Sequence, residues 1–537
     1  MDPSVRSPGS EACFPRGMTR PRTCQPVRRA AILAVSAAMS AFVPIPLGQR
    51  IPDSIHAVSC SLPTMRAVHG YERKDPEITQ HLTSGYPRFV LHPFLRQLSQ
   101  HLAQQQQLRG YTLWLTPSAH MAAELAAHLG SVHVIVVDAD GLHGVAHPEA
   151  PEVAARAKTF LQNVGGFLSS RAAEDHLVRL GLRPVAETEK LFTGDATVEV
   201  KRELRHAFPA AGEADVLLAS CGMNAVYATF RATAELQATR GRTLWVQLGW
   251  LYLDTIAILK KFTAAPNDYV YVSDVFDRAG LERLFAEHGD RIAGIVSEVP
   301  TNPLIQTPDV PWLAALARRH GALMLLDPSV TCAFNLDILP HADVVITSLT
   351  KYTANEGDLT AGAVVINPTA PDAAFLRRRI AGKLEPVYPR DLARLAAQIG
   401  ATGSVLAKIH ASVPTVVDFL KNHPGVKDVF WALHPASREN YLRVARAPDA
   451  VGSMISFTLR GSLEKFYDRL RLPKGPSFGM KTTLICPFMY LAHYDLVTTS
   501  TGRAELELSD LDPDLLRLSV GIEPAADIIA ALAEALA

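Results

Sequence analysis

Seven short apolar runs between residues 211 and 367 constrain the fold more than any other feature of the chain. They alternate with helical patterns, and many of them are apolar at successive positions. Such runs are typical of strands in a parallel sheet that helices cover on both faces. We therefore predict a large α/β domain. Its strands are expected at Asp215–Ala219, Thr243–Leu248, Tyr269–Val272, Ile292–Ser297, Ala322–Leu326, Asp343–Thr347 and Ala363–Ile366.

One segment between two of these strands carries clear helix boundaries. Asp309 can cap its start, Pro311 suits its first turn, and Gly321 follows its last turn. Leu313 and Leu316 lie on one face of the expected helix and can pack on the sheet. The segment is predicted to be a helix that joins two strands.

The last third of the chain has a different pattern. Residues 390–422 form a long, mostly apolar helical pattern that is expected to link the large domain to a smaller one. Strands are sparse after it, at Met454–Leu459 and Leu516–Val520, and an Ala-rich helix over 525–537 closes the chain. This mixture predicts an α+β C-terminal domain.

Size and charge exclude several classes of protein. A chain of 537 residues is too long for a single core, and its 53 basic and 53 acidic side chains cancel. A neutral chain has no broad electrostatic reason to bind nucleic acid or an anionic membrane. The six cysteines lack paired spacing, which suits the cytoplasm. His143 and His147 stand four apart, but Pro148 breaks any helix that would align them, so no metal site is predicted.

The N-terminal extension differs from the rest of the chain. Residues 1–29 are rich in Arg, Pro and Ser, which indicates disorder. The apolar stretch Ala30–Val43 follows two arginines and is similar to a secretory signal, although it is too short to span a bilayer. The alternatives are an extension of a cytoplasmic enzyme, which is the prediction, or a start at Met39.

Chemically useful side chains follow several of the predicted strands, where ligands gather in open α/β sheets. Gly222 and Met223 open a helix directly after a strand, so their backbone N–H groups can bind a phosphate. The strand 343–347 leads into Ser348, Thr350 and Lys351. The hydroxyls can donate to phosphate oxygens, and the lysine amine can attack an aldehyde.

Two further polar residues complete a possible cofactor site. Asp327 ends the strand 322–326, where a carboxylate needs a partner such as a pyridinium nitrogen. Asn302 follows another strand and can donate to a phenolate oxygen. Each residue also has an ordinary reading as a cap or turn residue. Their order on successive strand ends favours pyridoxal 5'-phosphate, with Lys351 bound to it as a Schiff base.

The sequence resembles the cysteine/methionine-metabolism family of pyridoxal-phosphate enzymes, and within it the long, fungal-type cystathionine gamma-synthases. The resemblance runs from about Pro44 to Ala537. It implies the type I, aspartate-aminotransferase-like transferase fold. The passages that carry it are Ser61–Thr64, Gly85–Phe89, Asn335–Asp343, Ser348–Tyr352 and Arg517–Glu523.

The resemblance implies roles for the cofactor residues. Lys351 would form the Schiff base, and Asp327 would pair with the pyridine nitrogen. Tyr252 would stack on the ring and act as a second acid/base. The residues that would hold the phosphate within one chain are Gly222, Met223, Ser348 and Thr350.

The resemblance also implies partners for the chain. Tyr86 and Arg88 would reach the phosphate of a neighbouring subunit, so the expected unit is a homodimer or homotetramer with a shared active site. Arg517, helped by Ser477, would hold the carboxylate of an amino-acid substrate. One departure bears on substrate preference, because Pro328 follows Asp327 where many family members have Asn.

The expected reaction is gamma-replacement, in which cysteine displaces the acyl group of an O-acylhomoserine to give cystathionine for methionine biosynthesis. A cystathionine gamma-lyase or an O-acylhomoserine sulfhydrylase is the alternative, and a non-catalytic binding protein with the same fold is a remote one. The predicted parts of the chain are the extension 1–43, an N-terminal arm with a family-specific segment over 44–210, the cofactor-binding domain 211–390, and the linking helix with the C-terminal domain 391–537.

Overall fold

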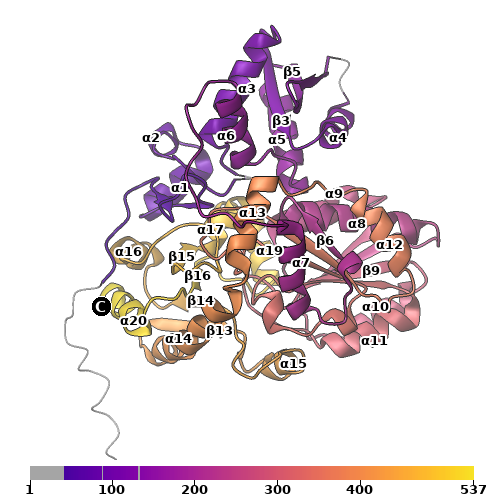
Figure 1. The fold of residues 1–537 in the computed structure, drawn as a ribbon. Helices are drawn as coiled ribbons and strands as arrows, with labels where there is room; N and C mark the ends of the chain where they lie inside the picture. Colours follow the sequence, from indigo (N-terminus) through magenta and orange to yellow (C-terminus); the bar gives the residue numbers. More distant parts are fainter. Residues whose placement is uncertain (1–40, 88, 131–132) are drawn as a thin grey trace, which may run out of the picture. The chain divides into compact units, whose positions relative to one another are not determined.

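The strands that were predicted to hold the site form one mixed sheet of seven strands (Figure 1). The computed structural model describes residues 41–537 except 88 and 131–132. The order of the strands is β6-β12-β11-β10-β9-β7-β8, and every neighbouring pair is parallel except the two that involve β12. Their bounds are β6 Val216–Ala219, β7 Leu244–Leu248, β8 Tyr269–Val272, β9 Ile292–Glu298, β10 Leu323–Asp327, β11 Val344–Ser348 and β12 Gly362–Ile366.

All seven predicted strands are confirmed, and each begins and ends within one residue of its predicted bounds. The apolar runs are continuous because the sheet is buried on both faces. In β11, Val344 and Ile346 pack into one core cluster and Val345 packs into the other. The strand β12 is antiparallel because a loop without a helix joins it to β11, and a parallel neighbour needs a long crossover.

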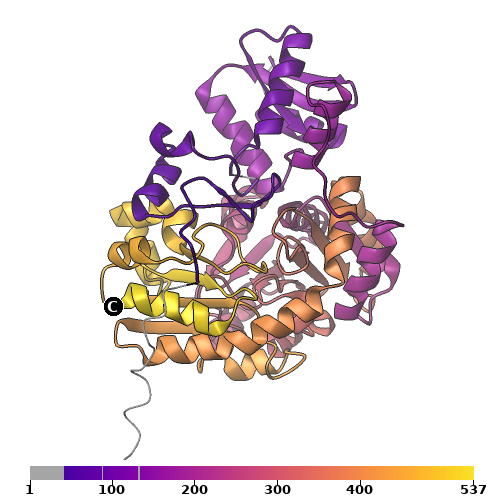
Figure 2. The ribbon, with the colours of Figure 1, turned by 60° about the vertical axis from the view of Figure 1, so that its left-hand side comes forward.

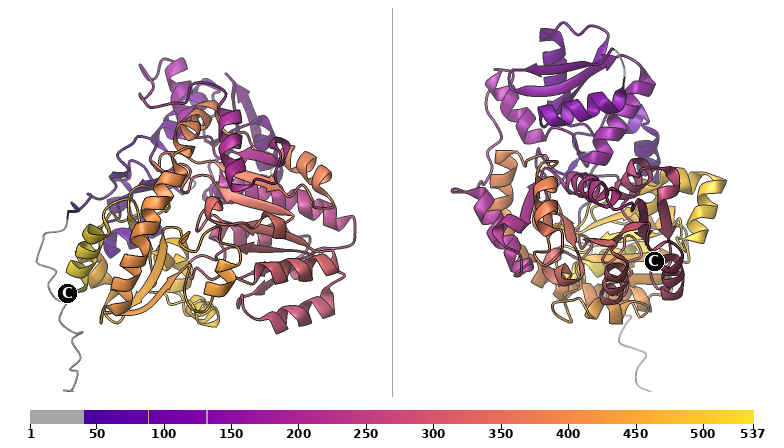
Figure 3. Two further views of the ribbon diagram at one scale, coloured as in Figure 1. Left: turned by 60° about the horizontal axis from the view of Figure 1, so that its bottom comes forward. Right: turned by 90° about the vertical axis from the view of Figure 1, so that its right-hand side faces the viewer.

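The helices between the strands cover both faces of the sheet (Figure 3). The helix α11 (Val310–His320) confirms the predicted boundaries, since Asp309 accepts a hydrogen bond from the Trp312 N–H at 3.3 Å and Gly321 takes a left-handed φ of 67°. The other helices of this region are α7 Ala196–Ala207, α8 Gly222–Ala238, α9 Leu253–Phe262, α10 Arg278–His288 and α12 Ala373–Ala381.

The C-terminal part forms a four-stranded antiparallel sheet, which confirms the predicted α+β class (Figure 3, orange to yellow). The strand order is β13 (Val426–Trp431), β14 (Met454–Leu459), β16 (Leu516–Ser519) and β15 (Leu484–Pro487). Its longer helices are α14 Thr402–Asn422, α16 Leu463–Arg469, α19 Ser500–Leu508 and α20 Ala525–Leu536, and the short ones are α15 Arg438–Leu442, α17 Phe488–Ala492 and α18 Tyr494–Thr498.

The long helical pattern over 390–422 is a pair of helices and not one helix. α13 (Pro389–Ile399) ends at Gly400, and α14 begins at Thr402. Glycine lowers helix stability by about 1 kcal/mol relative to alanine, which favours a break at this position. The apolar periodicity continues across the break, and this explains why the sequence pattern looked continuous.

The segment before the large sheet contains a small sheet of its own, which the sequence did not predict (Figure 2). Its antiparallel order is β3 (Tyr111–Thr116), β5 (Leu142–Pro148) and β4 (Ile135–Ala139). The helices beside it are α3 Pro93–Gln105, α4 Ala119–Leu129, α5 Pro151–Val164 and α6 Ser170–Arg179, and the N-terminal arm carries β1 Arg50–Ile51, β2 Ser59–Cys60, α1 Met65–Arg73 and α2 Pro76–Thr79.

The histidine pair considered as a metal site and the expected extension both belong to the N-terminal half of the chain. His143 and His147 lie on the strand β5 and not on a helix, and no cluster of three metal-ligating side chains occurs among the described residues. Residues 1–40 of the expected extension lie outside the described residues. Within the described part, no helix is long and apolar enough to cross a bilayer. Residues 40–537 group into one compact unit, so the internal boundaries at 210 and 390 stay predictions.

A buried arginine ties the small sheet's helices to the large domain. Arg171 of α6 is fully buried and donates to Glu189 at 2.6 Å, to the carbonyl oxygen of Asp358 at 2.8 Å and to Asp391 at 2.9 Å. Asp358 belongs to the loop between β11 and β12. A buried guanidinium is tolerated because carboxylates surround it, and these charges raise its pKa further.

Removal of this side chain should be costly. We expect Arg171→Ala to lower the free energy of unfolding by about 3–5 kcal/mol, because it leaves the buried carboxylate of Asp391 without its ion-pair partner. Glu189 and Asp358 would keep their ion pairs with Arg390 and Arg394. Denaturant unfolding followed by circular dichroism measures this. The matched control Arg66→Ala breaks an exposed pair with Glu77 and should change stability by at most about 1 kcal/mol. Equal effects of the two variants would contradict this account of the network.

Candidate active site

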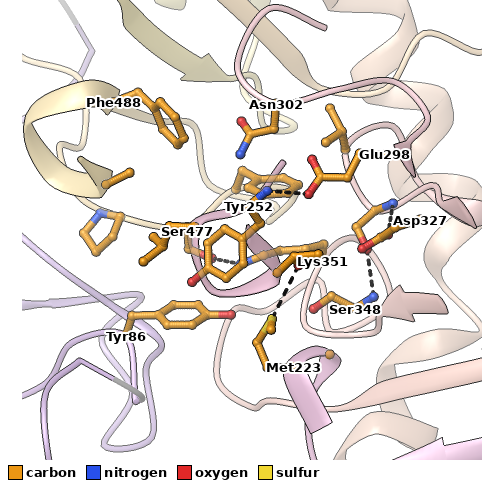
Figure 4. Close-up of a pocket in the computed structure, with 18 of the residues that line it drawn as sticks. Tyr86, Met223, Tyr252, Glu298, Asn302, Asp327, Ser348, Lys351, Ser477 and Phe488 are labelled. Carbon is orange, nitrogen blue, oxygen red and sulfur yellow. Dashed lines mark hydrogen bonds between the residues drawn. The ribbon is translucent and has the colours of Figure 1, made fainter. Parts of the chain in front are cut away.

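One cavity of about 120 Å³ lies at the carboxyl ends of β9, β10 and β11 and brings together most of the predicted site residues (Figure 4). This is the edge of an open α/β sheet where ligands bind. The predicted residues that line it are Tyr86, Gly222, Met223, Tyr252, Asn302, Asp327, Ser348, Lys351, Ser477 and Arg517.

The amine of Lys351 is held inside this cavity. Its Nζ donates to the Ser477 hydroxyl at 2.7 Å and lies 4.7 Å from the centre of the Tyr86 ring and 4.8 Å from that of Phe478. The residue is only 7% exposed. The strand β11 ends three residues before it, so the backbone places the amine firmly. A sheltered amine at a fixed place can react with an aldehyde.

The N-terminus of α8 forms one end of the cavity and fits a phosphate. Its cap residue Cys221 makes no side-chain capping bond, so the first backbone N–H groups are available to an anion. A Cβ on Gly222 would lie 2.9 Å from the Cβ of Ser348. Only glycine therefore leaves the space between these two residues open, as a close approach of a ligand to the backbone requires.

Thr350 is placed differently from its neighbours. Its hydroxyl lies 3.3 Å from the N–H and 3.4 Å from the carbonyl oxygen of Ala361, and the side chain is buried outside the cavity lining. Ser348 does line the cavity, and its own N–H donates to the Ser329 hydroxyl at 2.8 Å. The phosphate role of Thr350 stays a prediction from the resemblance.

Two carboxylates lie side by side at the base of the cavity. Asp327 ends β10 and is paired in register with Glu298, which ends β9. Asp327 accepts a hydrogen bond from the Ser329 N–H at 2.8 Å and has no ion pair within the described part of the chain. Burial raises the pKa of Asp327 to about 6. A cationic ring nitrogen is the partner that such a group lacks.

Glu298 was missed by the sequence reasoning, although it lies four residues before Asn302. The predicted strand ended at Ser297, and the structure extends β9 by the one residue that carries this carboxylate. The passage from Ser297 to Asn302 contains both polar side chains, but the prediction used only the amide of Asn302. Burial and the neighbouring Asp327 raise the pKa of Glu298 well above its ordinary value.

Arg517 reaches the cavity from β16 of the C-terminal sheet. The side chain is 7% exposed, donates to the Asn302 side-chain oxygen at 3.2 Å, and lies 4.4 Å from the centre of the Phe488 ring. No carboxylate of the described residues lies within ion-pair distance of it. A buried guanidinium without an ion pair to a described carboxylate is suited to bind the carboxylate of a ligand, with two parallel hydrogen bonds.

Part of the cavity wall is apolar, and the sequence did not reveal it. It is contributed by segments far apart in the chain, so no local motif records it. Its side chains are Phe89, Val226, Phe478, Cys486, Phe488, Leu491 and Ala492.

Tyr86 lines the cavity of its own chain. The resemblance implied that it serves the site of a neighbouring subunit, whereas its ring faces Lys351 of the same chain here. Arg88, its expected companion, lies outside the described residues. Tyr252 lies on another side of the cavity at the start of α9, where its backbone N–H donates to Glu298 at 2.6 Å. The oligomeric unit stays a prediction.

Comparison with known proteins identifies relatives that cover most of the chain. The model of a family described as Cys/Met metabolism PLP-dependent enzyme matches residues 202–537. The L-2-amino-4-chloropent-4-enoate dechlorinase/desaturase of Streptantibioticus cattleyicolor is 39% identical over 473 residues, which cover 88% of this chain and 94% of the relative. The cystathionine gamma-synthase of Neurospora crassa is 25% identical over 616 residues, which cover 92% and 98%.

A solved structure extends the comparison to the fold. The cystathionine gamma synthase of Xanthomonas oryzae pv. oryzae in complex with cystathionine matches with a TM-score of 0.53 and 22% identity. The match covers 66% of this chain and 89% of that one. At this level of identity the likeness concerns the fold alone.

The open space at Gly222 leads to the first prediction for the site. We expect Gly222→Ala to weaken the affinity for pyridoxal phosphate by about tenfold or more, because the added methyl group would fill the space beside Ser348. Fluorescence titration of the apo-protein measures this. The control Gly403→Ala adds its methyl group where no atom lies within 4 Å and should bind normally. Wild-type affinity of Gly222→Ala for pyridoxal phosphate would contradict a phosphate-binding site at the start of α8.

The position of Tyr86 leads to the second prediction. When the separately inactive variants Tyr86→Ala and Lys351→Ala are unfolded together and refolded as a mixture, we expect no recovery of activity. If Tyr86 acts within its own chain, every site in a mixed oligomer keeps one defect. Recovery of about a quarter of the wild-type activity, as the random mixing of two subunits would give for a site shared between chains, would contradict the arrangement seen here.

Proposed function

Because the chain belongs to the Cys/Met metabolism family of pyridoxal-phosphate-dependent enzymes, we propose that it eliminates a small uncharged group from the γ-carbon of an α-amino acid. The family confirms pyridoxal phosphate as the cofactor and, with the structural match, the predicted α/β fold. The observation that carries the proposal is the contrast between Arg517, the one guanidinium among the described lining residues, and the apolar side chains around it.

The residues at the base of the cavity fit the cofactor. Gly222 and the start of α8 would hold its phosphate, and Asp327 would hold its ring nitrogen. When it is bound, the cofactor supplies an electron sink in conjugation with the α-carbon of the substrate. The ionised carboxylate of Asp327 would keep the ring nitrogen protonated, and this favours that role.

Lys351 is the residue that would move protons. Its Nζ lies beside the Ser477 hydroxyl, which can accept one of its hydrogen bonds while the amine faces the substrate. The amine would take up the proton of the α-carbon and pass it to the conjugated electron sink, and as a free base it would then take a proton from the β-carbon. The bond from the γ-carbon to the leaving group would break with its electron pair on that group. Tyr252 lines the same cavity and is the second candidate acid/base.

The lining supports a substrate with one charged end. Arg517 would bind the α-carboxylate, and its hydrogen bond to Asn302 keeps the guanidinium in place. Among the described lining residues, Lys351 is the one other cation, and it has to react. A second carboxylate on the leaving group or on an incoming cysteine would therefore face Phe478, Phe488 and their apolar neighbours, where burial of an unpaired charge is costly.

The Streptantibioticus relative also supports the elimination of an uncharged group from the γ-carbon. The substrate in its name carries chlorine on carbon 4, which is the γ-carbon of the amino acid, and its side chain is uncharged. The relative is 39% identical along almost the whole length of both proteins. A compact apolar side chain of this kind suits the wall formed by Phe89, Phe488 and Leu491.

The second candidate is gamma-replacement, in which cysteine takes the place of the acyl group of an O-acylhomoserine. The likeness to the Neurospora cystathionine gamma-synthase along 92% of this chain favours it. Cystathionine gamma-lyase and sulfhydrylase activities would use the same residues with other leaving groups or nucleophiles. The arrangement of Lys351, Asp327 and Arg517 in one cavity argues against a non-catalytic binding protein.

A panel of substrates tests the proposal. The purified enzyme would be given L-2-amino-4-chloropent-4-enoate, O-succinyl- and O-acetylhomoserine with and without cysteine or sulfide, and cystathionine. We expect chloride release from the chlorinated amino acid without a thiol, with kcat/KM about tenfold or more above that for cystathionine formation.

Lys351→Ala is the control for this panel and should give no product from any substrate, as determined by mass spectrometry. Cystathionine as the main product, formed from an acylhomoserine and cysteine, would overturn the elimination and establish the second candidate. Inactivity of the wild-type holoenzyme on the whole panel would contradict both.

A further inference from the structure

Glu298 is a buried carboxylate that neither proposed reaction uses. It is 5% exposed, lines the cavity, and lies directly beside Asp327 in the parallel pairing of β9 with β10. Neighbouring strands are about 4.8 Å apart, and residues paired in register point to the same face. The two carboxyl groups are therefore close neighbours at the cavity (Figure 4).

One oxygen of Glu298 holds the backbone of Tyr252. Its Oε1 accepts a hydrogen bond from the Tyr252 N–H at 2.6 Å. Tyr252 is the cap residue of α9 and its own side chain makes no capping bond there. The carboxyl group of Glu298 therefore fixes the backbone from which the Tyr252 ring enters the cavity. Its other oxygen, Oε2, is buried without a hydrogen-bond partner among the described residues.

The surroundings decide which of the two carboxyl groups holds a proton. Asp327 is stabilised as an anion by hydrogen bonds from Ser329, and burial raises its pKa only to about 6. Burial and the charge of Asp327 raise the pKa of Glu298 well above its ordinary value, against the opposing effects of Arg517 and of backbone N–H groups. Two carboxyl groups at one site cannot both ionise cheaply, and Glu298, whose Oε2 has no hydrogen-bond partner among the described residues, keeps its proton.

We propose that Glu298 is a positioning residue, a neutral carboxylic acid that fixes Tyr252 through its backbone and leaves the negative charge at the base of the cavity to Asp327. The charged groups that face it are Asp327 on β10 and Arg517 on β16. An ionised Glu298 would put a second anion beside Asp327, where both would compete for one cationic ring nitrogen. This inference rests on the proposed cofactor seat and is independent of the choice between elimination and replacement.

Two substitutions of Glu298 distinguish a requirement for its hydrogen-bond acceptor from a requirement for its negative charge. Glu298→Gln keeps a carbonyl oxygen for the Tyr252 N–H and has no charge at any pH, whereas Glu298→Ala removes the acceptor. Glu282→Gln, at an exposed position of α10, is the matched control for the loss of a carboxylate.

The first measurement is the thermal unfolding of the apo-proteins between pH 5 and pH 9. A carboxyl group whose pKa is raised on folding binds more protons in the folded state, so the stability it contributes is lost as pH rises from 4.5, its ordinary pKa, towards the folded value. The Tm of Glu298→Gln should therefore exceed that of the wild type by a margin that grows with pH. The control Glu282→Gln should keep the wild-type slope. A Glu298→Gln variant with that same slope would overturn the proposal.

The second measurement is the affinity for pyridoxal phosphate at pH 7.5, with kcat on the best substrate of the panel. Glu298→Gln should stay within about threefold of the wild type in both, and Glu298→Ala should lose about tenfold or more in kcat because Tyr252 is no longer held. A Gln variant as impaired as the Ala variant would overturn the proposal, since the charge would then be required. The apo-protein unfolding and the cofactor affinity need no substrate, so failure of the proposed reaction would not affect them.

Discussion

The parallel pairing of β9, β10 and β11 is the constraint on which the site depends. It brings three strand ends to one edge of the sheet, and so Glu298, Asp327 and Ser348 lie next to one another although they are far apart in the chain. The pairing is stable because both faces of the strands are buried in separate core clusters. A shift of one residue in the register would turn these polar side chains to the opposite face of the sheet, and they would no longer line the cavity.

The part of the site built by the sheet could be predicted because each of its residues follows a local pattern. Asp327, Ser348 and Lys351 were located once the apolar runs had been recognised, since strand ends are visible in sequence. Glu298 was lost because the predicted strand stopped one residue early, at the boundary where single-sequence reasoning is weakest. The break at Gly400 was missed for the related reason that apolar periodicity continues through it.

The remaining part of the site could not be predicted because tertiary packing alone assembles it. Arg517 comes from a second sheet, Tyr86 from the N-terminal arm, and Phe488 from a short helix near the C-terminus. No spacing in the sequence records that these side chains meet. The resemblance to a known family supplied Arg517 and Tyr86 but not the apolar wall, and the role of Tyr86 towards a neighbouring subunit stays a prediction.

Charge and shape together explain how related enzymes on this fold can differ in reaction. In the proposed function, the base of the cavity, with Asp327, Lys351 and the start of α8, would serve the cofactor whatever group leaves the γ-carbon. The apolar part of the cavity wall would decide which group leaves, because a second carboxylate needs a second cation and an uncharged group needs none. In this chain the described wall consists of aromatic and aliphatic side chains around one guanidinium. Substrate choice therefore depends on residues outside the cofactor motifs, which is where a family resemblance is least informative.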